Sequence, residues 1–287
     1  MAIWGIVAVD LDGTVVRRGL EIRRADREAL HRALEAGLLP VVATGRRPAT
    51  ARRFANDLGL SESPLICCDG ALVIGPDGED WLAQPVPREV VRKAAALCQE
   101  HGVAAGFSTR ERLYVQPGNV RLHPWRHLLR RGALRSPGKL RRALWDIAER
   151  TVVRERFDAD DAPPVYKIDL FGPGSAEARP WLMSEVEGVT ETMPKGPLEV
   201  VTEGVDKASG IEAVLRRTGL AWERVVAIGN DWNDALMIER AGFGVAMGDA
   251  PRAVRERARH VTGSILEGGV ASALEHYLAV HAPGDRL

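Results

Sequence analysis

The sequence predicts an α/β fold, with a doubly wound parallel sheet as the core and a second α/β domain inserted through it. Near both ends of the chain, short apolar runs rich in β-branched residues alternate with amphipathic segments at helical spacing. In the middle of the chain the apolar runs are weaker, prolines are more frequent, and several segments alternate between apolar and polar residues. Several of the apolar runs end abruptly at polar side chains, which is typical of the edge of a parallel sheet.

The N-terminal part contains three expected strands and two expected helices. Residues 3–9 form an apolar run without polar alternation, which predicts a strand buried on both faces. Residues 24–36 carry apolar side chains at helical spacing and end at Gly37. The alternation continues with a strand over 39–43, a helix over 48–58 and a strand over 64–68.

The C-terminal part repeats this alternation, and the middle differs from both. Helices are expected over 206–218, 233–241 and 251–258, and strands over 225–228 and 244–246. In the middle, a half-exposed antiparallel sheet is expected from 107–115, 166–171 and 198–201, with helices over 89–101 and 179–186. We therefore expect a core formed by residues 1–83 and 203–287, and an inserted domain formed by residues 84–202.

Composition excludes several classes of protein. The 287 residues are 45% hydrophobic and 27% charged, an ordinary globular balance, and 39 Lys and Arg match 39 Asp and Glu. This balance gives no global electrostatic reason to expect a nucleic-acid or membrane partner. The three cysteines, Cys67, Cys68 and Cys98, make a poor disulfide framework and suit a reducing compartment. No leader-like segment and no long apolar span is found, so a cytoplasmic location is expected.

Polar groups follow the predicted strands at one edge of the core sheet. Asp10 and Asp12 follow the first strand, Thr44 follows the second, and a polar loop over 230–234 follows a later one. Lys207 opens a helix, and helix N-termini face the same edge. Because ligands bind at the carboxyl ends of strands in open α/β sheets, we expect these groups to converge there.

The segment Asp10-Leu11-Asp12-Gly13-Thr14 carries the clearest chemical signal. Two carboxylates at a strand end are costly unless a positive charge lies beside them. Mg²⁺ prefers oxygen ligands and keeps room for waters and a phosphate, while Gly13 permits a sharp exit from the strand. Taken alone, this short pattern is equally compatible with a solvated turn.

Four motifs in order resemble the haloacid dehalogenase superfamily, and the middle insertion is similar to the α/β cap of its Cof-like subgroup. The motifs are Asp10-Leu11-Asp12-Gly13-Thr14, Thr44 in Ala43-Thr44-Gly45-Arg46, Lys207 in Gly204-Val205-Asp206-Lys207, and Gly229-Asn230-Asp231-Trp232-Asn233-Asp234. Flanking segments agree: Cys68-Asp69-Gly70-Ala71, Gly244-Val245-Ala246-Met247-Gly248 and Glu267-Gly268-Gly269-Val270-Ala271. The resemblance implies a Rossmann-like core with an inserted α/β cap, and an Mg²⁺-dependent phosphatase acting on a small phosphorylated metabolite such as a sugar phosphate.

The resemblance also implies a role for each motif residue. Asp10 would attack phosphorus and form an aspartyl-phosphate, and Asp12 would act as acid and then base. Thr44 and Lys207 would stabilise the charge of the phosphoryl group. The implied phosphate-binding residues are Thr44, Gly45, Arg46, Lys207 and Asn233, with Asn233 reaching the phosphate or orienting Lys207. The implied metal site comprises Asp10, Asp12, Asn230, Asp231 and Asp234, with Asp234 holding a metal-bound water.

Two departures and several alternatives remain open at the level of sequence. The family usually has Asp at the position of Asn230. Three alternatives follow: Asn230 is a neutral ligand, Asp231 replaces it, or the metal binds weakly and activity is low. Ala208 is a milder departure, because the family prefers glycine there. Arg46 fits either a substrate contact or a salt bridge, and the basic segment 121–142 fits either an attraction for anionic substrates or a solvated face. A phosphomutase, a narrow sugar-phosphate phosphatase and a non-catalytic binding protein are the rival functions, and oligomeric state is not predicted.

Overall fold

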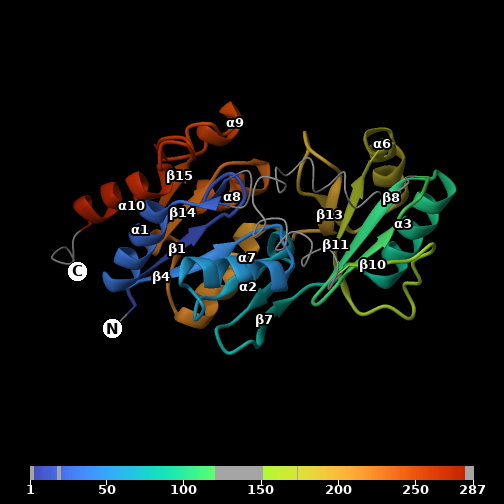
Figure 1. The fold of residues 1–287 in the computed structure, drawn as a ribbon, viewed down its shortest axis with the longest axis horizontal. Coiled ribbons are helices and arrows are strands. Elements are labelled where there is room, and N and C mark those ends of the chain that lie inside the picture. Colours follow the sequence, from blue (N-terminus) through green and yellow to red (C-terminus); the bar gives the residue numbers. More distant parts are fainter. Residues whose placement is uncertain (1–2, 18–20, 120–150, 173, 282–287) are drawn as a thin grey trace.

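A computed structural model describes residues 3–17, 21–119, 151–172 and 174–281. Its described residues form two large sheets, which lie in separate parts of the molecule, and a two-stranded ribbon (Figure 1). The basic segment 121–142, for which two interpretations were left open, lies outside the described residues. Among the described residues, no helix is both long and apolar enough to cross a membrane.

The first sheet has the strand order β16-β15-β14-β1-β4-β5-β6-β7 in the described part of the chain. The six strands from β16 to β5 are parallel, whereas β6 and β7 add an antiparallel edge. The strands are β1 (Gly5–Val9), β4 (Leu38–Ala43), β5 (Leu65–Cys67), β6 (Leu72–Ile74), β7 (Asp80–Ala83), β14 (Val225–Gly229), β15 (Phe243–Ala246) and β16 (His260–Val261). The ribbon pairs β2 (Val16–Arg17) with β3 (Glu21–Ile22).

Helices cover both faces of this sheet, which makes it doubly wound. Val7 and Val9 of β1 point into one core cluster, and Ile6 and Ala8 point into the other. The first cluster includes α1 (Arg24–Glu35), α2 (Pro48–Leu58) and α10 (Gly269–Val280), and the second includes α7 (Lys207–Thr218), α8 (Ala235–Arg240) and α9 (Arg252–Arg255). The predicted α/β fold with a sheet rich in parallel strands is therefore confirmed.

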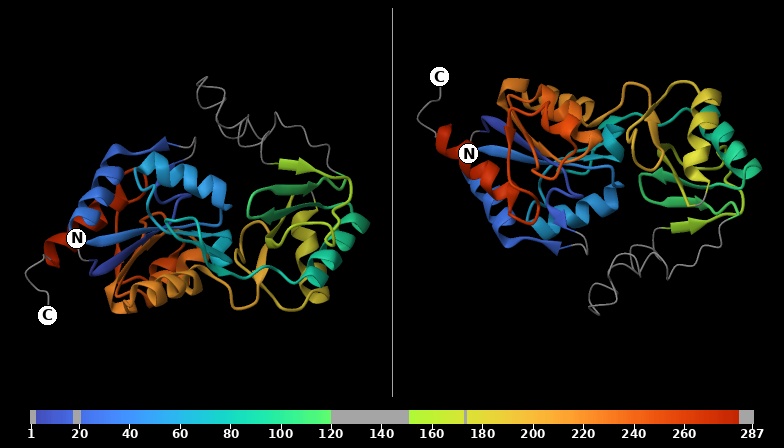
Figure 2. Two further views of the ribbon diagram at one scale, coloured as in Figure 1. Left: turned by 90° about the horizontal axis from the view of Figure 1, so that it is seen from below. Right: turned by 90° about the horizontal axis from the view of Figure 1, so that it is seen from above.

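The second sheet has the strand order β10-β9-β8-β11-β13-β12. Its strands are β8 (Ala104–Thr109), β9 (Leu113–Gln116), β10 (Thr151–Val153), β11 (Val165–Phe171), β12 (Val189–Glu191) and β13 (Glu199–Thr202). All pairs are antiparallel except β9 with β10. The helices α3 (Arg88–Glu100) and α6 (Ser175–Glu185) pack on one face through a third apolar cluster, on the side away from the first sheet (Figures 1 and 2).

Several sequence-based boundaries are wrong, among them that of the helix expected over 179–186, which already begins at Ser175 as α6. The expected single strand over 107–115 is a hairpin of β8 and β9, because the polar residues between them form a turn in which the Thr109 amide donates to the Arg112 carbonyl. The expected helix over 233–241 begins only at Ala235, after a 3₁₀ turn, η4 (Trp232–Asp234). The expected helix over 251–258 is only α9, because the chain after it continues in i to i−3 turns.

Candidate active site

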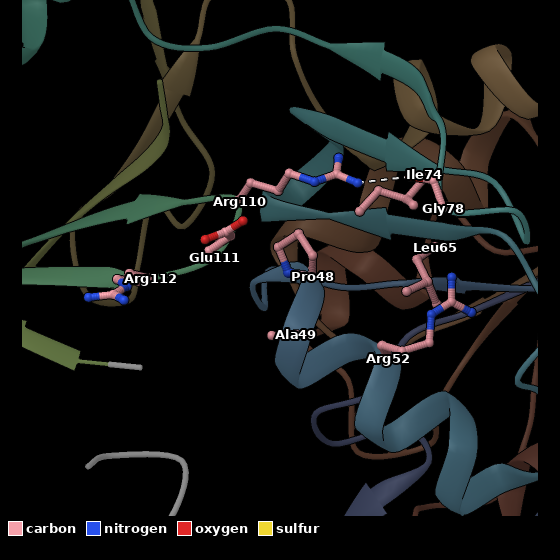
Figure 3. Close-up of a pocket in the computed structure, with 9 residues that line it drawn as sticks. All are labelled: Pro48, Ala49, Arg52, Leu65, Ile74, Gly78, Arg110, Glu111 and Arg112. Carbon is pink, nitrogen blue, oxygen red and sulfur yellow. Dashed lines mark hydrogen bonds between the residues drawn. The ribbon is translucent and has the colours of Figure 1, made fainter. Parts of the chain in front are cut away.

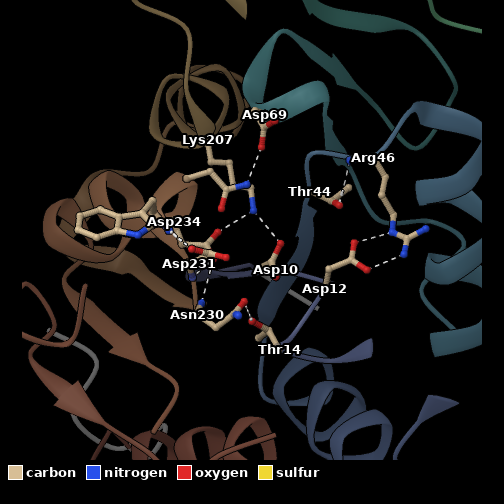
Figure 4. A network of polar contacts seen from close by, with 12 residues as sticks. Asp10, Asp12, Thr14, Thr44, Arg46, Asp69, Lys207, Asn230, Asp231 and Asp234 are labelled. Carbon is tan, nitrogen blue, oxygen red and sulfur yellow. Dashed lines mark hydrogen bonds and ion pairs between the residues drawn. The ribbon is translucent and has the colours of Figure 1, made fainter. Parts of the chain in front are cut away.

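A buried ion-paired cluster lies at the carboxyl end of β1 (Figure 4). Asp10 follows the last residue of β1, and its amide donates to the Ile228 carbonyl of the neighbouring strand β14. Lys207, the first residue of α7, donates from Nζ to Asp10 Oδ1 at 2.7 Å and to Asp234 Oδ1 at 2.6 Å. Lys207 and Asp234 are fully buried, and Asp10 is nearly so. The sequence-predicted residues Asp10, Lys207 and Asp234 are thus brought into direct contact.

The charges of this cluster do not balance. Burial, and after it the Asp234 carboxylate, raise the pKa of Asp10 to about 8, although Lys207 offsets part of this rise. Burial lowers the pKa of Lys207, but the carboxylates of Asp10, Asp234 and Asp69 more than compensate and hold it above its usual value. One lysine therefore faces an excess of buried negative charge, which is costly without a further cation.

A dication fits this excess charge, and the donor set is chemically suitable. Asp10, Asp12, Asn230 and Asp231 carry the oxygen ligands that Mg²⁺ prefers. As the side chains of the described residues lie, no three His, Cys, Asp or Glu residues are grouped as a complete set of metal ligands. The carboxylate oxygens of Asp10, Asp12 and Asp231 instead accept hydrogen bonds from Lys207, from Arg46 and from a backbone amide, respectively. Metal binding would replace some of these hydrogen bonds.

The loop after β14 is organised by its own side chains. Asp234 Oδ2 accepts hydrogen bonds from the amides of Asn230 at 2.9 Å and Asp231 at 3.0 Å. Asp231 Oδ1 accepts from the Trp232 amide at 2.8 Å, which begins η4. Asn230 Oδ1 accepts from Thr14 Oγ1 at 3.0 Å. Asn230 therefore faces the first motif, while Asp231 caps its own loop.

Asp12 and Arg46 form a bidentate ion pair at the more exposed side of the site (Figure 4). Arg46 donates from Nε to Asp12 Oδ2 at 2.6 Å and from a terminal nitrogen to Asp12 Oδ1 at 2.5 Å. The guanidinium also lies 4.7 Å from the ring centre of Phe54. Of the two interpretations left open for Arg46, the structure shows the salt bridge. Nearby, the buried Thr44 accepts from the Arg46 amide at 3.2 Å.

Two charged residues of this region were not predicted. The Asp69 carboxylate is fully buried and accepts from Asn233 Nδ2 at 2.7 Å, so Asn233 contacts Asp69. Lys167 of β11 donates from Nζ to the same carboxylate at 3.2 Å. The sequence offered two weak signals: Asp69 directly follows a predicted buried strand, and Lys167 is a charged residue within the alternating segment 166–171.

A separate hollow lies between α2 and the turn that joins β8 to β9 (Figure 3). It encloses about 450 Å³ and is lined by Pro48, Ala49, Arg52, Leu65, Ile74, Gly78, Arg110, Glu111 and Arg112. None of the motif residues lines it. Arg52 donates to the Ser61 and Ser63 carbonyls, and Arg110 pairs with Asp80, so two of its arginines have structural partners. The hollow is therefore separate from the cluster around Asp10.

Comparison with known proteins defines the class. The family model of haloacid dehalogenase-like hydrolases matches residues 7–274, and the chain belongs to this family. A 5-amino-6-(5-phospho-D-ribitylamino)uracil phosphatase of Bacillus subtilis is 28% identical over 275 residues, covering 95% of each chain. A pyridoxal phosphate phosphatase of Escherichia coli is 28% identical over 284 residues, covering 95% of this chain and 98% of its own.

Solved structures agree with this assignment. A haloacid dehalogenase-like hydrolase of Bacteroides thetaiotaomicron is 26% identical, with a TM-score of 0.76 and coverage of 96% of this chain and 99% of its own. A sugar phosphatase of subclass IIB, at 24% identity and a TM-score of 0.76, shares the fold over 96% of this chain and 99% of its own. The predicted resemblance is confirmed, and the protein is a phosphoric monoester hydrolase of this family.

Proposed function

We propose that the protein is an Mg²⁺-dependent phosphatase that hydrolyses a small phosphate monoester through an aspartyl-phosphate on Asp10. The observation that carries this proposal is the placement of Asp10 at the end of β1, in contact with a fully buried Lys207. A buried carboxylate paired with a fixed cation, at the sheet edge where ligands bind, is suited to positioning a phosphoryl group.

The proposed reaction has two steps at phosphorus. An Asp10 oxygen attacks, the bond from phosphorus to the leaving oxygen breaks, and Asp12 gives that oxygen a proton. A water then attacks the aspartyl-phosphate, Asp12 accepts its proton, and phosphate and the Asp10 carboxylate are released. Lys207 offsets negative charge throughout, and Thr44 can donate its hydroxyl hydrogen to a phosphoryl oxygen. To act in this way, Asp12 exchanges at least one of its hydrogen bonds from Arg46.

The proposed metal site uses Asp10, Asp12 and Asn230. Asn230 is preferred to Asp231 because its carboxamide faces Thr14 of the first motif, whereas Asp231 accepts from the Trp232 amide of its own loop. When bound, Mg²⁺ would neutralise part of the charge on the phosphoryl group and on the carboxylates. The fully buried Asp234 is engaged by Lys207 and by the loop amides, which favours a structural role over direct ligation.

The substrate is proposed to bind between a core of residues 1–83 and 203–287 and a cap of residues 84–202. The second sheet supplies Lys167 to the edge of the site, which supports a cap that completes it. Because relatives named for different phosphorylated metabolites match the chain at the same 28% identity, we propose a small phosphorylated metabolite and no single compound. The composition and the cysteines support a cytoplasmic location.

The test is phosphate release from a panel of small esters, including sugar phosphates, pyridoxal phosphate and a ribitylamino-uracil phosphate, with and without Mg²⁺. Release that requires Mg²⁺ and is abolished in Asp10→Asn supports the proposal. Asp161→Asn is the matched control and should retain activity, because Asp161 is an exposed residue between β10 and β11 of the second sheet. Undiminished release from Asp10→Asn would overturn the mechanism, and an isomerised phosphate ester without free phosphate would identify a phosphomutase.

A further inference from the structure

The turn after β5 has an unusual backbone. Cys68 and Asp69 have φ values of 50° and 55°, and among the described residues they are the two non-glycine residues with positive φ. Left-handed backbone is unfavourable for side chains with a Cβ, and it persists where surrounding contacts hold it. Both residues are fully buried within the 3₁₀ turn η1 (Cys68–Gly70). The contacts around this turn therefore stabilise a backbone conformation that is unfavourable by itself.

This turn contacts the loop Thr44-Gly45-Arg46, whose residues the sequence predicts to bind phosphate and which is called the phosphate loop below. The Asp69 amide donates to the Thr44 carbonyl at 3.2 Å, and the Cys68 amide donates to the Arg46 carbonyl at 3.0 Å. The Asp69 carboxylate lies against Gly45, where an added Cβ would come within 2.9 Å of both of its oxygens. The backbone and the side chain of Asp69 thus both support the Thr44–Arg46 loop.

The same turn contacts two further parts of the site. The Asp69 carboxylate accepts from Asn233 of η4 at 2.7 Å. Gly70, with φ of 106°, packs directly against the Asp206 carbonyl, one residue before Lys207. Asp69 and its neighbour therefore link three elements of the site, namely the Thr44–Arg46 loop, η4 and the N-terminus of α7.

A cation from the second sheet holds this carboxylate. Lys167 lies on β11, its side chain is only 7% exposed, and its Nζ is 3.2 Å from Asp69 Oδ2. Nζ also contacts Glu199 at 2.7 Å and Asp169 at 3.2 Å, both on the second sheet. Lys167 thus connects carboxylates of the second sheet to the one carboxylate that supports the phosphate loop.

We propose that Lys167 and Asp69 form a positioning pair, in which Lys167 fixes the Asp69 carboxylate and Asp69 fixes the Thr44–Arg46 loop and Asn233 around the phosphoryl group. This inference rests on the proposed function, and it assigns a role in catalysis to a residue of the second sheet. Neither residue needs to touch the reacting atoms. The pair acts only when the second sheet lies against the first, so it makes the geometry of the phosphate site depend on that contact.

The charges agree with this assignment. Burial alone would raise the pKa of Asp69, but Lys167, then Lys207 and the hydrogen bond from Asn233, hold it below its usual value. Asp69 is therefore a carboxylate that both lysines attract. Removing Lys167 would leave that charge facing Lys207, which also has to offset the charge of Asp10 and the phosphoryl group.

The test compares Lys167→Met, Asp69→Asn and the double variant with the wild type. Each single change should lower kcat by about 10- to 100-fold, as loss of a supporting contact does in pre-organised sites, and should change KM less. The double variant should lose little more than the worse single variant, because coupled residues are not additive. Asp69→Asn keeps the side-chain volume and leaves Lys167 two carboxylates, so it remains informative if Lys167→Met folds poorly.

Lys93→Met is the matched control, because Lys93 pairs with Glu185 on the helices of the second sheet and is half-exposed. Its kcat should equal that of the wild type. Calorimetric binding of inorganic phosphate with Mg²⁺ is a second readout that needs no turnover, and affinity should fall by about tenfold in both single variants. The proposed positioning pair would be refuted if Lys167→Met and Asp69→Asn both kept the kcat and phosphate affinity of the wild type. It would also be refuted if the losses of the two single variants multiplied in the double variant. A wild type that binds phosphate without releasing it from any ester would overturn only the proposed function.

Discussion

Replacing Lys207 by methionine is the perturbation whose consequence the structure defines most sharply. Methionine has a similar length but no charge, so Asp10 and Asp234 would lose the cation that lies between them at 2.7 and 2.6 Å. Removing one partner of a buried pair costs about 3–5 kcal/mol, because the remaining charge is left without compensation. At roughly 2 °C per kcal/mol for a chain of this size, we expect the melting temperature to fall by about 6–10 °C.

This loss should depend on pH, with a definite sign. In Lys207→Met the Asp10 carboxyl is buried without its cation, so its folded pKa should lie further above the unfolded value than in the wild type. An acid with a raised folded pKa destabilises the fold above that pKa, and the penalty disappears as the pH falls toward the unfolded value. The deficit relative to the wild type should therefore be larger near about pH 8 than near about pH 5.

The assay is thermal unfolding in metal-free buffer at both pH values. Lys207→Met/Asp234→Asn should recover part of the stability without recovering activity, since one of the two unpaired carboxylates is gone. The half-exposed Lys93→Met should change stability by less than about 1 kcal/mol. The reasoning is refuted if Lys207→Met melts with the wild type at the higher pH, or if its deficit grows as the pH is lowered.

Three further changes test other parts of the account. Gly70→Ala should destabilise by at least about 2 kcal/mol in urea unfolding, because its φ is 106° and a Cβ would meet the Asp206 carbonyl; a neutral effect would contradict this. Asn230→Asp should tighten Mg²⁺ binding by about tenfold in a calorimetric titration, because a charged oxygen replaces a neutral one, and unchanged affinity would argue against Asn230 as a ligand. Burial, together with the carboxylates of Asp169 and Asp69, raises the pKa of Glu199 to about 7 despite Lys167. The wild type should therefore lose stability relative to Glu199→Gln as the pH rises from about 4.5 to 7. A difference in melting temperature that stays constant over this range would contradict the prediction.

The sequence was sufficient for the core of the fold where the apolar pattern is continuous. The run over 3–9 ends at Asp10, and the structure places β1 directly before that residue. The antiparallel edge of β6 and β7 was missed because each strand is too short to show a period. The Gly75-Pro76-Asp77-Gly78 turn between them was the usable signal.

Some contacts of the candidate site could also be predicted from the sequence, and others could not. The contact between Asp10 and Lys207 could be predicted, because the carboxyl ends of parallel strands and the following helix N-termini share one edge. The contact between Asp69 and Lys167 could not, because it joins residues on different sheets and depends on how the second sheet lies against the first. A lysine on an alternating strand predicts a solvated face, whereas the structure buries it among three carboxylates.

The most direct test of the central claim is to trap the phosphoryl group on Asp10. Asp12→Asn would be mixed with labelled p-nitrophenyl phosphate and Mg²⁺, because this leaving group needs no proton from an acid, while the second step still needs the base. The account predicts a burst of about one p-nitrophenol per site without equal phosphate release, and a hydroxylamine-sensitive label on the peptide that contains Asp10. Equal release of p-nitrophenol and phosphate with no label on Asp10, or a label on another residue, would contradict it.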